Sequence, residues 1–352
     1  MVRRHPRQEP PDFLFPDAGD GMDVLVIGGT RNLGPQIVAR LLEAGDRVTV
    51  FNRGRTPGEL PAGVERVFGD RTDPAQLRAA VRGRGFDAVI DTTLYDGAEA
   101  RAAVEVFGGI VGHYVFLSTG QVYLVGDPQP PRPFREADYD RPVMPEPAPG
   151  TADHDGWSYG VLKRQAEDVF AEAFASSGFP FTSLRLPMVH SERDHYGRIH
   201  GYLLRLLDGG PILLPEGQDL PVRHVYGADV AAAVDRVIRS GHGKGRAYNV
   251  GQDETLSLGG FLSTLGTVAG REVRTVRLPR ERLEREGLLP ACSPFSGRWM
   301  SSLDNSLGKR EMGFAYTPFA EYLPRLVRHY RSGDVPPPAG YAQRADELRL
   351  LG

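Results

Sequence analysis

Short apolar runs alternate along the first half of the chain with segments whose apolar residues recur at helical spacing. The runs are rich in β-branched residues and end at glycine or polar residues, which is typical of buried strands. Alternation at this spacing favours right-handed crossovers and a parallel sheet with helices on both faces. We expect strands over 22–29, 47–54, 86–93 and 113–123 and helices over 35–45, 74–85 and 97–109.

Residues 126–156 interrupt this rhythm with many Pro and Asp residues, and we expect them to be mostly loop. Regularity returns with a helix over about 157–177 and a strand over 181–187, followed by shorter mixed elements. The expected fold is α/β: a Rossmann-type doubly wound parallel sheet with a smaller C-terminal α/β substrate lobe. The expected parts are a polar leader (1–21), a dinucleotide-binding domain (22–187), a mainly substrate-binding lobe (188–331) from which about 224–251 packs back on the first domain, and a tail (332–352).

The composition is that of a soluble globular protein, with 352 residues, 40% hydrophobic, 25% charged and a net charge of -3. This balance gives no electrostatic footprint for nucleic acid. No run approaches about 18–20 apolar residues, so no membrane span is expected, and the leader lacks the apolar run of a signal peptide. The single cysteine, Cys292, excludes an internal disulfide and suits a reducing compartment, so the cytoplasm is the expected location.

The first predicted strand runs into the sequence GGTRNLG (28–34) and then into a helix. In such a strand–turn–helix unit, backbone N–H groups at the helix N-terminus face a phosphate, and glycine allows the tight turn. The spacing departs from the usual glycine fingerprint because arginine takes the middle position. An ordinary strand–helix turn is the alternative. The cofactor contacts expected in this turn are Gly28, Thr30, Arg31, Asn32, Leu33 and Gly34.

The end of the second predicted strand selects the dinucleotide. An NAD site has a carboxylate there for the ribose 2′-hydroxyl, but this chain has FNRGR (51–55), with no acid. Because guanidinium groups bind a 2′-phosphate well, we favour NADP as cofactor and keep NAD, with these arginines merely at the surface, as the alternative. Asp70 is expected either to accept from the adenine amino group or to cap a turn. The remaining expected cofactor contacts are Asn52, Arg53, Asp70, Arg71, Thr92, Thr93 and Pro187.

Tyr159 and Lys163 stand four residues apart in the predicted helix 157–177, a spacing that places both on one face. Lys163 is one of only three lysines in the chain. A phenol, with an ordinary pKa of about 10, is an effective acid or base only when its anion is stabilised, so we expect Lys163 to lower the Tyr159 pKa. Thr119, or its neighbour Ser118, is expected to hold the substrate oxygen opposite Tyr159. A chance pairing is the alternative.

Five motifs occur along the chain in the following order: GGTRNLG (28–34), STGQVY (118–123), YGVLK (159–163), LRLP (184–187) and DNSLGKREMGF (304–314). Together they resemble the extended short-chain dehydrogenase/reductases, the NAD(P)-dependent epimerase/dehydratase group. The GGTR turn and FNRG look most similar to the atypical branch, which includes the chloroplast stem-loop-binding proteins. The resemblance implies a Rossmann fold, hydride transfer with Tyr159 as acid/base, Lys163 bound to the nicotinamide ribose, and a homodimer.

Sugar-nucleotide 4,6-dehydratases of this group carry an Asp-Glu pair directly after the threonine, as the acid and base for water elimination. This chain has Gly120 and Gln121 there, and neither can transfer a proton, so dehydration is not expected. The resemblance leaves reduction or epimerisation at a ketone or secondary alcohol. The implied substrate is a sugar, a sugar-nucleotide or a similar polyhydroxylated small molecule.

Epimerases of the group have an Asn after LRLP and an Arg near RHVYGADVA. This chain has Met188 at the first place and Val222 at or near the second. Arg223, one residue further on, and Arg298, beside Trp299, are expected to replace part of that diphosphate clamp. The histidines in this region are either packing residues or substrate contacts. The expected substrate-side residues are Gln121, His190, Tyr196, Arg223, His224 and Arg298.

Two non-enzymatic functions stay open: an NADP(H)-binding scaffold without catalysis, and an RNA-binding protein of the chloroplast stem-loop-binding type. The presence of Thr119, Tyr159 and Lys163 argues against a scaffold. The mild acidity, and the lack of a basic run with interleaved aromatics, argues against RNA. We therefore expect a small-molecule substrate and no membrane partner. No metal is expected, since His195 and His200 lack a third ligand.

Overall fold

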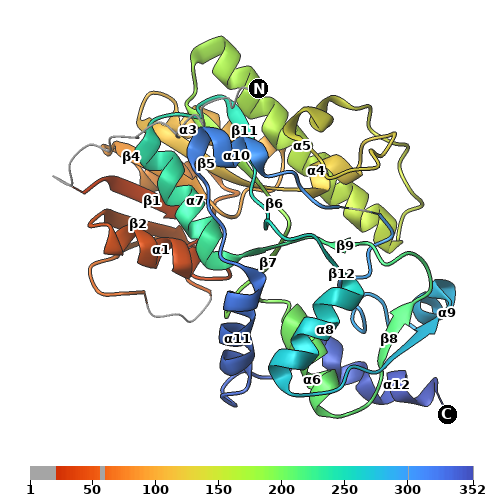
Figure 1. Ribbon diagram of the computed structural model, residues 1–352. Coiled ribbons are helices and arrows are strands. Elements are labelled where there is room, and N and C mark those ends of the chain that lie inside the picture. The colour runs from red at the N-terminus through yellow and green to blue at the C-terminus, as the bar shows by residue number, and fades with distance from the viewer. Residues whose placement is uncertain (1–20, 56–59, 300, 352) are drawn as a thin grey trace, which may run out of the picture.

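The computed structural model describes residues 21–55, 60–299 and 301–351, so residues 1–20 of the predicted leader lie outside it. Its centre is a seven-stranded parallel sheet with the order β11-β6-β5-β4-β1-β2-β3 (Figure 1). This confirms the predicted Rossmann-type α/β fold. The strands are β1 (Asp23–Ile27), β2 (Arg47–Asn52), β3 (Glu65–Phe68), β4 (Phe86–Asp91), β5 (Val111–Thr119), β6 (Phe181–Leu186) and β11 (Arg246–Asn249).

Helices cover both faces of the sheet, because successive side chains of each buried strand point to opposite sides. Val24 and Val26 of β1 belong to one hydrophobic core, whereas Leu25 and Ile27 of the same strand belong to the other. Within the described residues, none of the helices combines the length and apolar character needed to cross a membrane. The first core includes α1 (Gly34–Glu43), α7 (Gly227–Ser240) and α10 (Ser306–Met312), and the second includes α2 (Pro74–Ala80), α3 (Gly97–Phe107) and α5 (Ala152–Ser177).

Helix α5 begins at Ala152, earlier than the predicted 157 and inside the segment expected to be loop. The Thr151 side chain accepts a hydrogen bond from the His154 backbone N–H. Asp153 and Asp155 add negative charge to the first turn, where the helix dipole favours it. The Pro- and Asp-rich composition therefore hid a well-capped helix start. The same segment also contains a short 3-10 helix, η1 (Glu136–Asp140).

A smaller lobe extends from the carboxyl ends of the strands (Figure 1). Its core is aromatic, with Tyr202, Phe261 and Tyr322 fully buried. Three later elements return to the first domain, since α7 packs on α1, β11 pairs with β6 at the sheet edge, and α10 packs on α7 and β11. The other elements are β7 (Met188–His190), α6 (Arg198–Leu207), β8 (Ile212–Pro215), β9 (Pro221–Val222), β10 (His224–Tyr226), β12 (Leu256–Ser257), α8 (Leu258–Ala269), β13 (Thr275–Leu278), α9 (Arg280–Arg285) and α11 (Phe319–Tyr330).

The predicted tail is part of this lobe over its described residues, 332–351. The short helices η2 (Ala339–Gln343) and α12 (Arg344–Arg349) end the chain. The Glu347 carboxylate is fully buried and accepts hydrogen bonds from Arg205 Nε of α6 and from Arg344 Nη1, each at 2.9 Å. Because buried charges are stable only when paired, this ion-pair cluster fixes α12 on α6.

Candidate active site

In the turn between β1 and α1, neighbouring atoms approach the backbone so closely that two positions have no room for a side chain. Gly28 has a φ of +111°, and a Cβ there would lie 2.1 Å from Thr92 Oγ1. A Cβ at Gly34 would lie 2.6 Å from the carbonyl carbon of Gly29. Helix α1 has no side-chain N-cap, so its first N–H groups can bind an anion, as the sequence predicts.

This turn lines a cavity of about 300 Å³ that continues past the ends of β2 and β4. Asn32 Oδ1 and Asn52 Nδ2, from residues in its wall, are buried without a hydrogen-bond partner. Buried polar atoms normally have partners, so a polar ligand is expected to complete these two. A dinucleotide fits this donor and acceptor set. The predicted cofactor residues that line the cavity are Gly28, Thr30, Arg31, Asn32, Asn52, Arg53, Asp70, Arg71, Thr92 and Thr93.

Two of these residues are already engaged within the protein. The buried Arg71 guanidinium lies 2.6 Å from Asp91 Oδ2 and 3.1 Å from Glu99 Oε2. Burial alone would lower the Arg71 pKa, but the charge and hydrogen bond of Asp91, together with Tyr114 and Glu99, outweigh it and the pKa is raised. Asp70 accepts from the Thr72 hydroxyl at 2.8 Å and from its N–H at 3.0 Å. Asp70 thus caps a turn, and Arg71 positions the strand ends instead of offering a free charge to the cofactor.

Arg31, Arg53 and Arg55 differ from Arg71 because they are exposed and pair with no carboxylate among the described residues. All three line the cavity where β2 ends. Asn52 Oδ1 accepts from the Gly54 N–H at 2.9 Å and so shapes the turn that carries them. In Rossmann folds this is where the ribose 2′ group is recognised.

A second cavity, of about 380 Å³, adjoins the first and shares Arg31, Asn32 and Thr92 with it. The shared walls make one groove that runs from the end of β2 to β5 and α5. Strand β5 contributes the threonine and α5 contributes the Tyr-x-x-x-Lys pair. The residues of the sequence prediction that meet here are Leu33, Ser118, Thr119, Gln121, Tyr159, Lys163, Pro187, Tyr196 and Arg223.

The side chains of Thr119 and Tyr159 both line this cavity, and the Thr119 hydroxyl acts on the pKa of Tyr159. Burial raises the pKa of Tyr159, and the Thr119 hydroxyl and the Arg223 charge oppose this rise without cancelling it. The net shift is therefore opposite to the lowering expected from Lys163. The ammonium of Lys163 lies 5.9 Å from the centre of the Tyr159 ring, on the same side of the helix.

Lys163 is held by backbone carbonyls instead of by the phenol. Its Nζ donates to Leu94 O at 2.6 Å and to Leu117 O at 3.1 Å. Burial lowers the Lys163 pKa to about 8, although the carboxylates of Asp91 and Glu167 act in the opposite direction. The lysine therefore connects α5 to the ends of β4 and β5, at the wall of the second cavity.

Ser118 has a different role from the one predicted as an alternative to Thr119. Its hydroxyl donates to Glu167 Oε1 at 2.5 Å, and Glu167 Oε2 lies 2.5 Å from Arg185 Nη2. All three side chains are buried. The Ser118 hydroxyl is thus occupied by Glu167, and Thr119 is the residue of the pair that acts on the pKa of Tyr159. Ser118 instead fastens β5 to α5.

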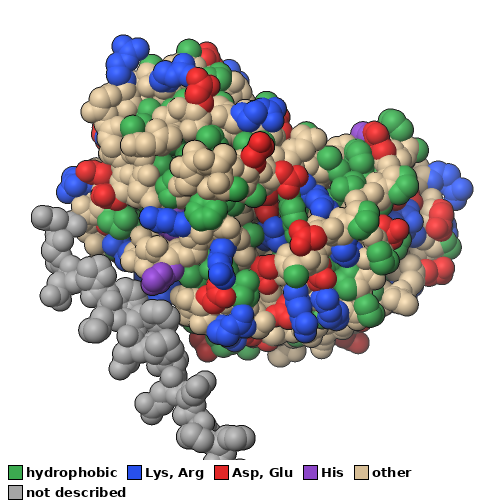
Figure 2. Space-filling view, turned by 90° about the horizontal axis from the view of Figure 1, so that it is seen from above, with side chains coloured by type: hydrophobic (Ala, Val, Ile, Leu, Met, Phe, Trp, Pro, Cys, Tyr) green, Lys and Arg blue, Asp and Glu red, His purple; other side chains and the backbone are tan. Residues whose placement is uncertain are grey.

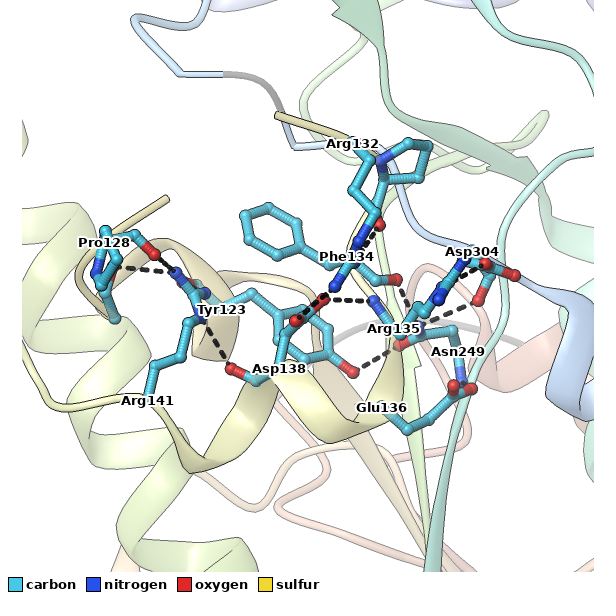
Figure 3. A network of polar contacts seen from close by, with 12 residues as sticks. Tyr123, Pro128, Arg132, Phe134, Arg135, Glu136, Asp138, Arg141, Asn249 and Asp304 are labelled. Atoms are coloured by element: carbon cyan, nitrogen blue, oxygen red, sulfur yellow. Dashed lines mark hydrogen bonds and ion pairs between the residues drawn. The ribbon is translucent and has the colours of Figure 1, made fainter. Parts of the chain in front are cut away.

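The same network fixes the connection between β5 and α5. Arg185 donates to the Tyr123 hydroxyl, which donates to Asn249 Oδ1, each at 2.7 Å. Asn249 Nδ2 in turn donates to Phe134 O at 2.9 Å, and Arg141 Nη2 donates to Tyr123 O at 2.7 Å (Figure 3). The proline-rich loop is thereby attached to the short helix α4 (Gln121–Leu124) and to the sheet edge.

Arg223 and Gln121, which we predict to lie on the substrate side, both line the second cavity. Both terminal nitrogens of Arg223 lie 3.4 Å from Gln121 Oε1. Burial lowers the Arg223 pKa to about 10, and the charge of Arg198 adds to this effect. Among the described residues no carboxylate pairs with Arg223, so its charge is available to an anionic group.

The predicted substrate residues His190, His224 and Arg298 do not line this cavity, whereas Tyr196 does. His190 is 1% exposed and stacks on His224 with ring centres 5.2 Å apart, inside the aromatic core of the lobe. Burial holds the pKa of His190 well below its usual range. Arg298 lines a separate cavity beside Trp299, and its Nη2 lies 2.6 Å from Glu284 Oε1. The two residues are thus used for core packing and for an ion pair.

Arg198 and Tyr95 are site residues that sequence reasoning missed. Arg198 is the first residue of α6 and lines the catalytic cavity, but nothing in the pattern GRIHGYLL indicates this. Tyr95 follows β4 by a few residues, and its ring centre lies 5.5 Å from that of Tyr159. Its position after a parallel strand is a signal that could have found it, because ligands bind at the carboxyl ends of such strands.

A groove at the carboxyl ends of a doubly wound sheet, with Tyr-x-x-x-Lys on the helix beside it, defines the short-chain dehydrogenase/reductase class. The sequence profile of the NAD dependent epimerase/dehydratase family matches residues 24–107 and 99–251. The chain belongs to this family of NAD(P)-dependent oxidoreductases and epimerases, and the family expected from the five motifs is confirmed.

The chain is also similar to individual proteins, at sequence identities of 22–25%. A 2'-dehydrokanamycin reductase of Streptomyces kanamyceticus is 25% identical, covering 74% of this chain and 71% of its own. The chloroplast stem-loop binding protein of 41 kDa b of Arabidopsis thaliana is 22% identical. The match covers 74% of this chain and 67% of that protein. Among solved structures, the UDP-glucose 4-epimerase of Thermus thermophilus in complex with NAD is similar with a TM-score of 0.67 and 23% identity, covering 89% of this chain and 100% of that one.

Proposed function

We propose that the protein is an NADP(H)-dependent oxidoreductase that acts at a ketone or secondary alcohol of a small molecule, with Tyr159 as the acid/base. The observation that carries this proposal is the meeting of Thr119, Tyr159 and Lys163 in the wall of one groove that also contains the glycine turn. Such a groove accommodates an extended dinucleotide with its reactive end beside the tyrosine.

The residues divide the chemistry as follows. The bound nicotinamide would supply or accept the hydride. Because its pKa is raised, Tyr159 carries its proton at neutral pH and can donate it to a carbonyl oxygen, which Thr119 holds in place. Lys163, with a pKa of about 8, is largely protonated at neutral pH and would donate hydrogen bonds to the nicotinamide ribose.

Reduction and epimerisation both remain compatible with these groups, whereas water elimination lacks a carboxylate beside Thr119. Gln121 occupies the position of the acidic residue, and its amide oxygen faces Arg223. Arg223 suits an anionic substituent of the substrate, in keeping with the sugar and nucleotide-linked substrates that the family resemblance favours. The exposed Arg31, Arg53 and Arg55 support NADP over NAD.

The cofactor that the purified protein carries distinguishes the two reactions. Denaturation followed by mass spectrometry of the extract measures the bound dinucleotide. Tightly retained cofactor supports an epimerase, which takes and returns hydride within one site. A protein that is purified empty and then binds NADPH in the micromolar range supports a reductase, which exchanges cofactor in each turnover. No binding of NADPH or NADH would refute the proposal.

RNA binding is a second candidate, favoured by the similarity to the stem-loop binding protein. Against it, the face in Figure 2 has Lys and Arg side chains interspersed with Asp and Glu instead of a continuous basic band. A filter-binding assay across salt concentrations tests it, because phosphate-driven binding weakens steeply as salt rises. Salt-dependent binding of a structured RNA with submicromolar affinity would favour this candidate.

A further inference from the structure

Tyr159 and Tyr196 line the second cavity, and Tyr95 packs beside Tyr159. The ring of Tyr95 is tilted by 43° to that of Tyr159, with centres 5.5 Å apart. Tyr196, in the loop before α6, lines the same cavity. Tyr95 and Tyr196 are 43% and 65% exposed, although both are large aromatic side chains. Apolar surface gathered beside a reaction site is a feature of ligand-binding grooves.

The guanidinium groups of Arg198 and Arg223 also line this cavity. The guanidinium carbon of Arg198 lies 4.3 Å from the centre of the Tyr196 ring, in a stacking position. Arg223 lines the cavity next to Gln121, 3.4 Å from its Oε1, and has no carboxylate partner in the described part of the chain. The charged residues that line the cavity, within the described residues, are Arg31, Lys163, Arg198 and Arg223, all of them cationic.

Few acceptors in this cavity are left for the hydroxyl groups of a sugar once a cofactor is bound, because the unpartnered Asn32 Oδ1 belongs to the wall that this cavity shares with the first one. Within the described residues its lining includes no Asp or Glu, and the Gln121 amide oxygen already faces Arg223. The nearby Asp194 carboxylate accepts from the backbone N–H groups of Tyr196 at 3.1 Å and Arg198 at 3.0 Å, and its Oδ1 also lies 3.4 Å from Arg198 Nη1. Hydroxyl groups need acceptors as well as donors when they are buried. The walls therefore suit flat faces and negative charge better than a polyol.

We propose that the substrate is a ketone with a flat, conjugated ring and an anionic substituent, and that Tyr95 and Tyr196 determine this specificity. The proposal rests on the oxidoreductase function proposed above and departs from the sugar implied by the family resemblance. The face of the ring lies on the two tyrosines, since aromatic groups favour stacked or tilted contacts. The anion, a carboxylate or a phosphate, binds Arg198 and Arg223.

Binding of two test ketones distinguishes a flat-ring, anionic substrate from a polyhydroxylated, sugar-like one. Benzoylformate has a flat ring and a carboxylate, whereas dihydroxyacetone phosphate has an anion and hydroxyl groups but no ring. Binding of each to the full chain with NADP⁺ is measured by saturation-transfer NMR and titration. We expect the dissociation constant of benzoylformate to be at least tenfold lower than that of dihydroxyacetone phosphate.

Substitution of the tyrosines identifies the residues responsible. Tyr95→Ala and Tyr196→Ala should each weaken benzoylformate binding at least fivefold and leave dihydroxyacetone phosphate within twofold. Tyr95→Phe and Tyr196→Phe should keep wild-type affinity, because the stacking face is retained. Phe174→Ala, an exposed position on α5, is the matched control. An unchanged NADPH affinity in each variant demonstrates that the fold is intact.

Equal affinity for the two ketones, or an equal effect of the alanine variants on both, would overturn the proposal. So would the absence of any ketone binding by a protein that binds NADPH. Absence of NADPH binding as well would overturn the oxidoreductase function itself, and this inference with it.

Discussion

The Glu167 carboxylate and the Arg185 guanidinium form a buried ion pair, with 2.5 Å between Oε2 and Nη2. Glu167 lies one helical turn after Lys163 on α5, and Arg185 belongs to β6. The same carboxylate accepts the Ser118 hydroxyl from β5 at 2.5 Å. This pair therefore joins the helix that carries Tyr159 and Lys163 to the strand that carries Thr119.

Removing Glu167 should destabilise the protein strongly. Glu167→Ala leaves the Arg185 charge buried without its carboxylate, so we expect a loss of about 3–5 kcal/mol in the free energy of unfolding. Urea denaturation followed by circular dichroism measures this loss. Glu172→Ala, at an exposed position of the same helix, should change it by less than about 0.5 kcal/mol. Similar values for the two variants would refute a structural role for the pair.

Arg53 should distinguish NADPH from NADH. Arg53→Ala removes an exposed guanidinium from the end of β2, so the dissociation constant of NADPH should rise about tenfold or more, as for a lost charged hydrogen bond. The dissociation constant of NADH should change less than about twofold, because NADH has no 2′-phosphate. Isothermal titration of both cofactors gives the two values, and exposed Arg82→Ala serves as control. Equal weakening of both cofactors would exclude recognition of the 2′-phosphate by Arg53.

The stacked histidines in the lobe should make stability depend on pH. Burial lowers the His224 pKa to about 4, and Nε2 of both His190 and His224 is without a hydrogen-bond partner. Below pH of about 6.5 the unfolded chain binds protons that these folded imidazoles do not, so stability falls as pH decreases from about 6.5 to 4. His224→Phe should make this decrease shallower by up to about 1.4 kcal/mol per pH unit.

Urea titrations at pH values between about 4.5 and 6.5 measure this slope, with exposed His242→Phe as the control. Equal slopes for wild type and His224→Phe would mean that His224 is not held neutral by the fold.

Much of the site is local enough to be read from the sequence. The GGTRNLG turn is dictated by glycine conformation, and the Tyr159–Lys163 pair by helix geometry, so both were predictable. Ser118, Arg71 and Arg298 were not, because each is defined by a carboxylate that tertiary folding brings to it from a distant segment. His190 illustrates the same limit, since only packing reveals that it belongs to the core.

The central claim is that Tyr159 transfers the proton in an NADP(H)-dependent reaction, and Tyr159→Phe tests it most directly. The substrate is the ketone that most rapidly oxidises NADPH in a screen with the wild-type protein. The substitution removes the hydroxyl that lines the cavity beside Thr119, so kcat should fall at least about 100-fold, as for a lost general acid. The NADPH dissociation constant, measured by titration, should stay within about threefold. Full activity in this variant would contradict the account.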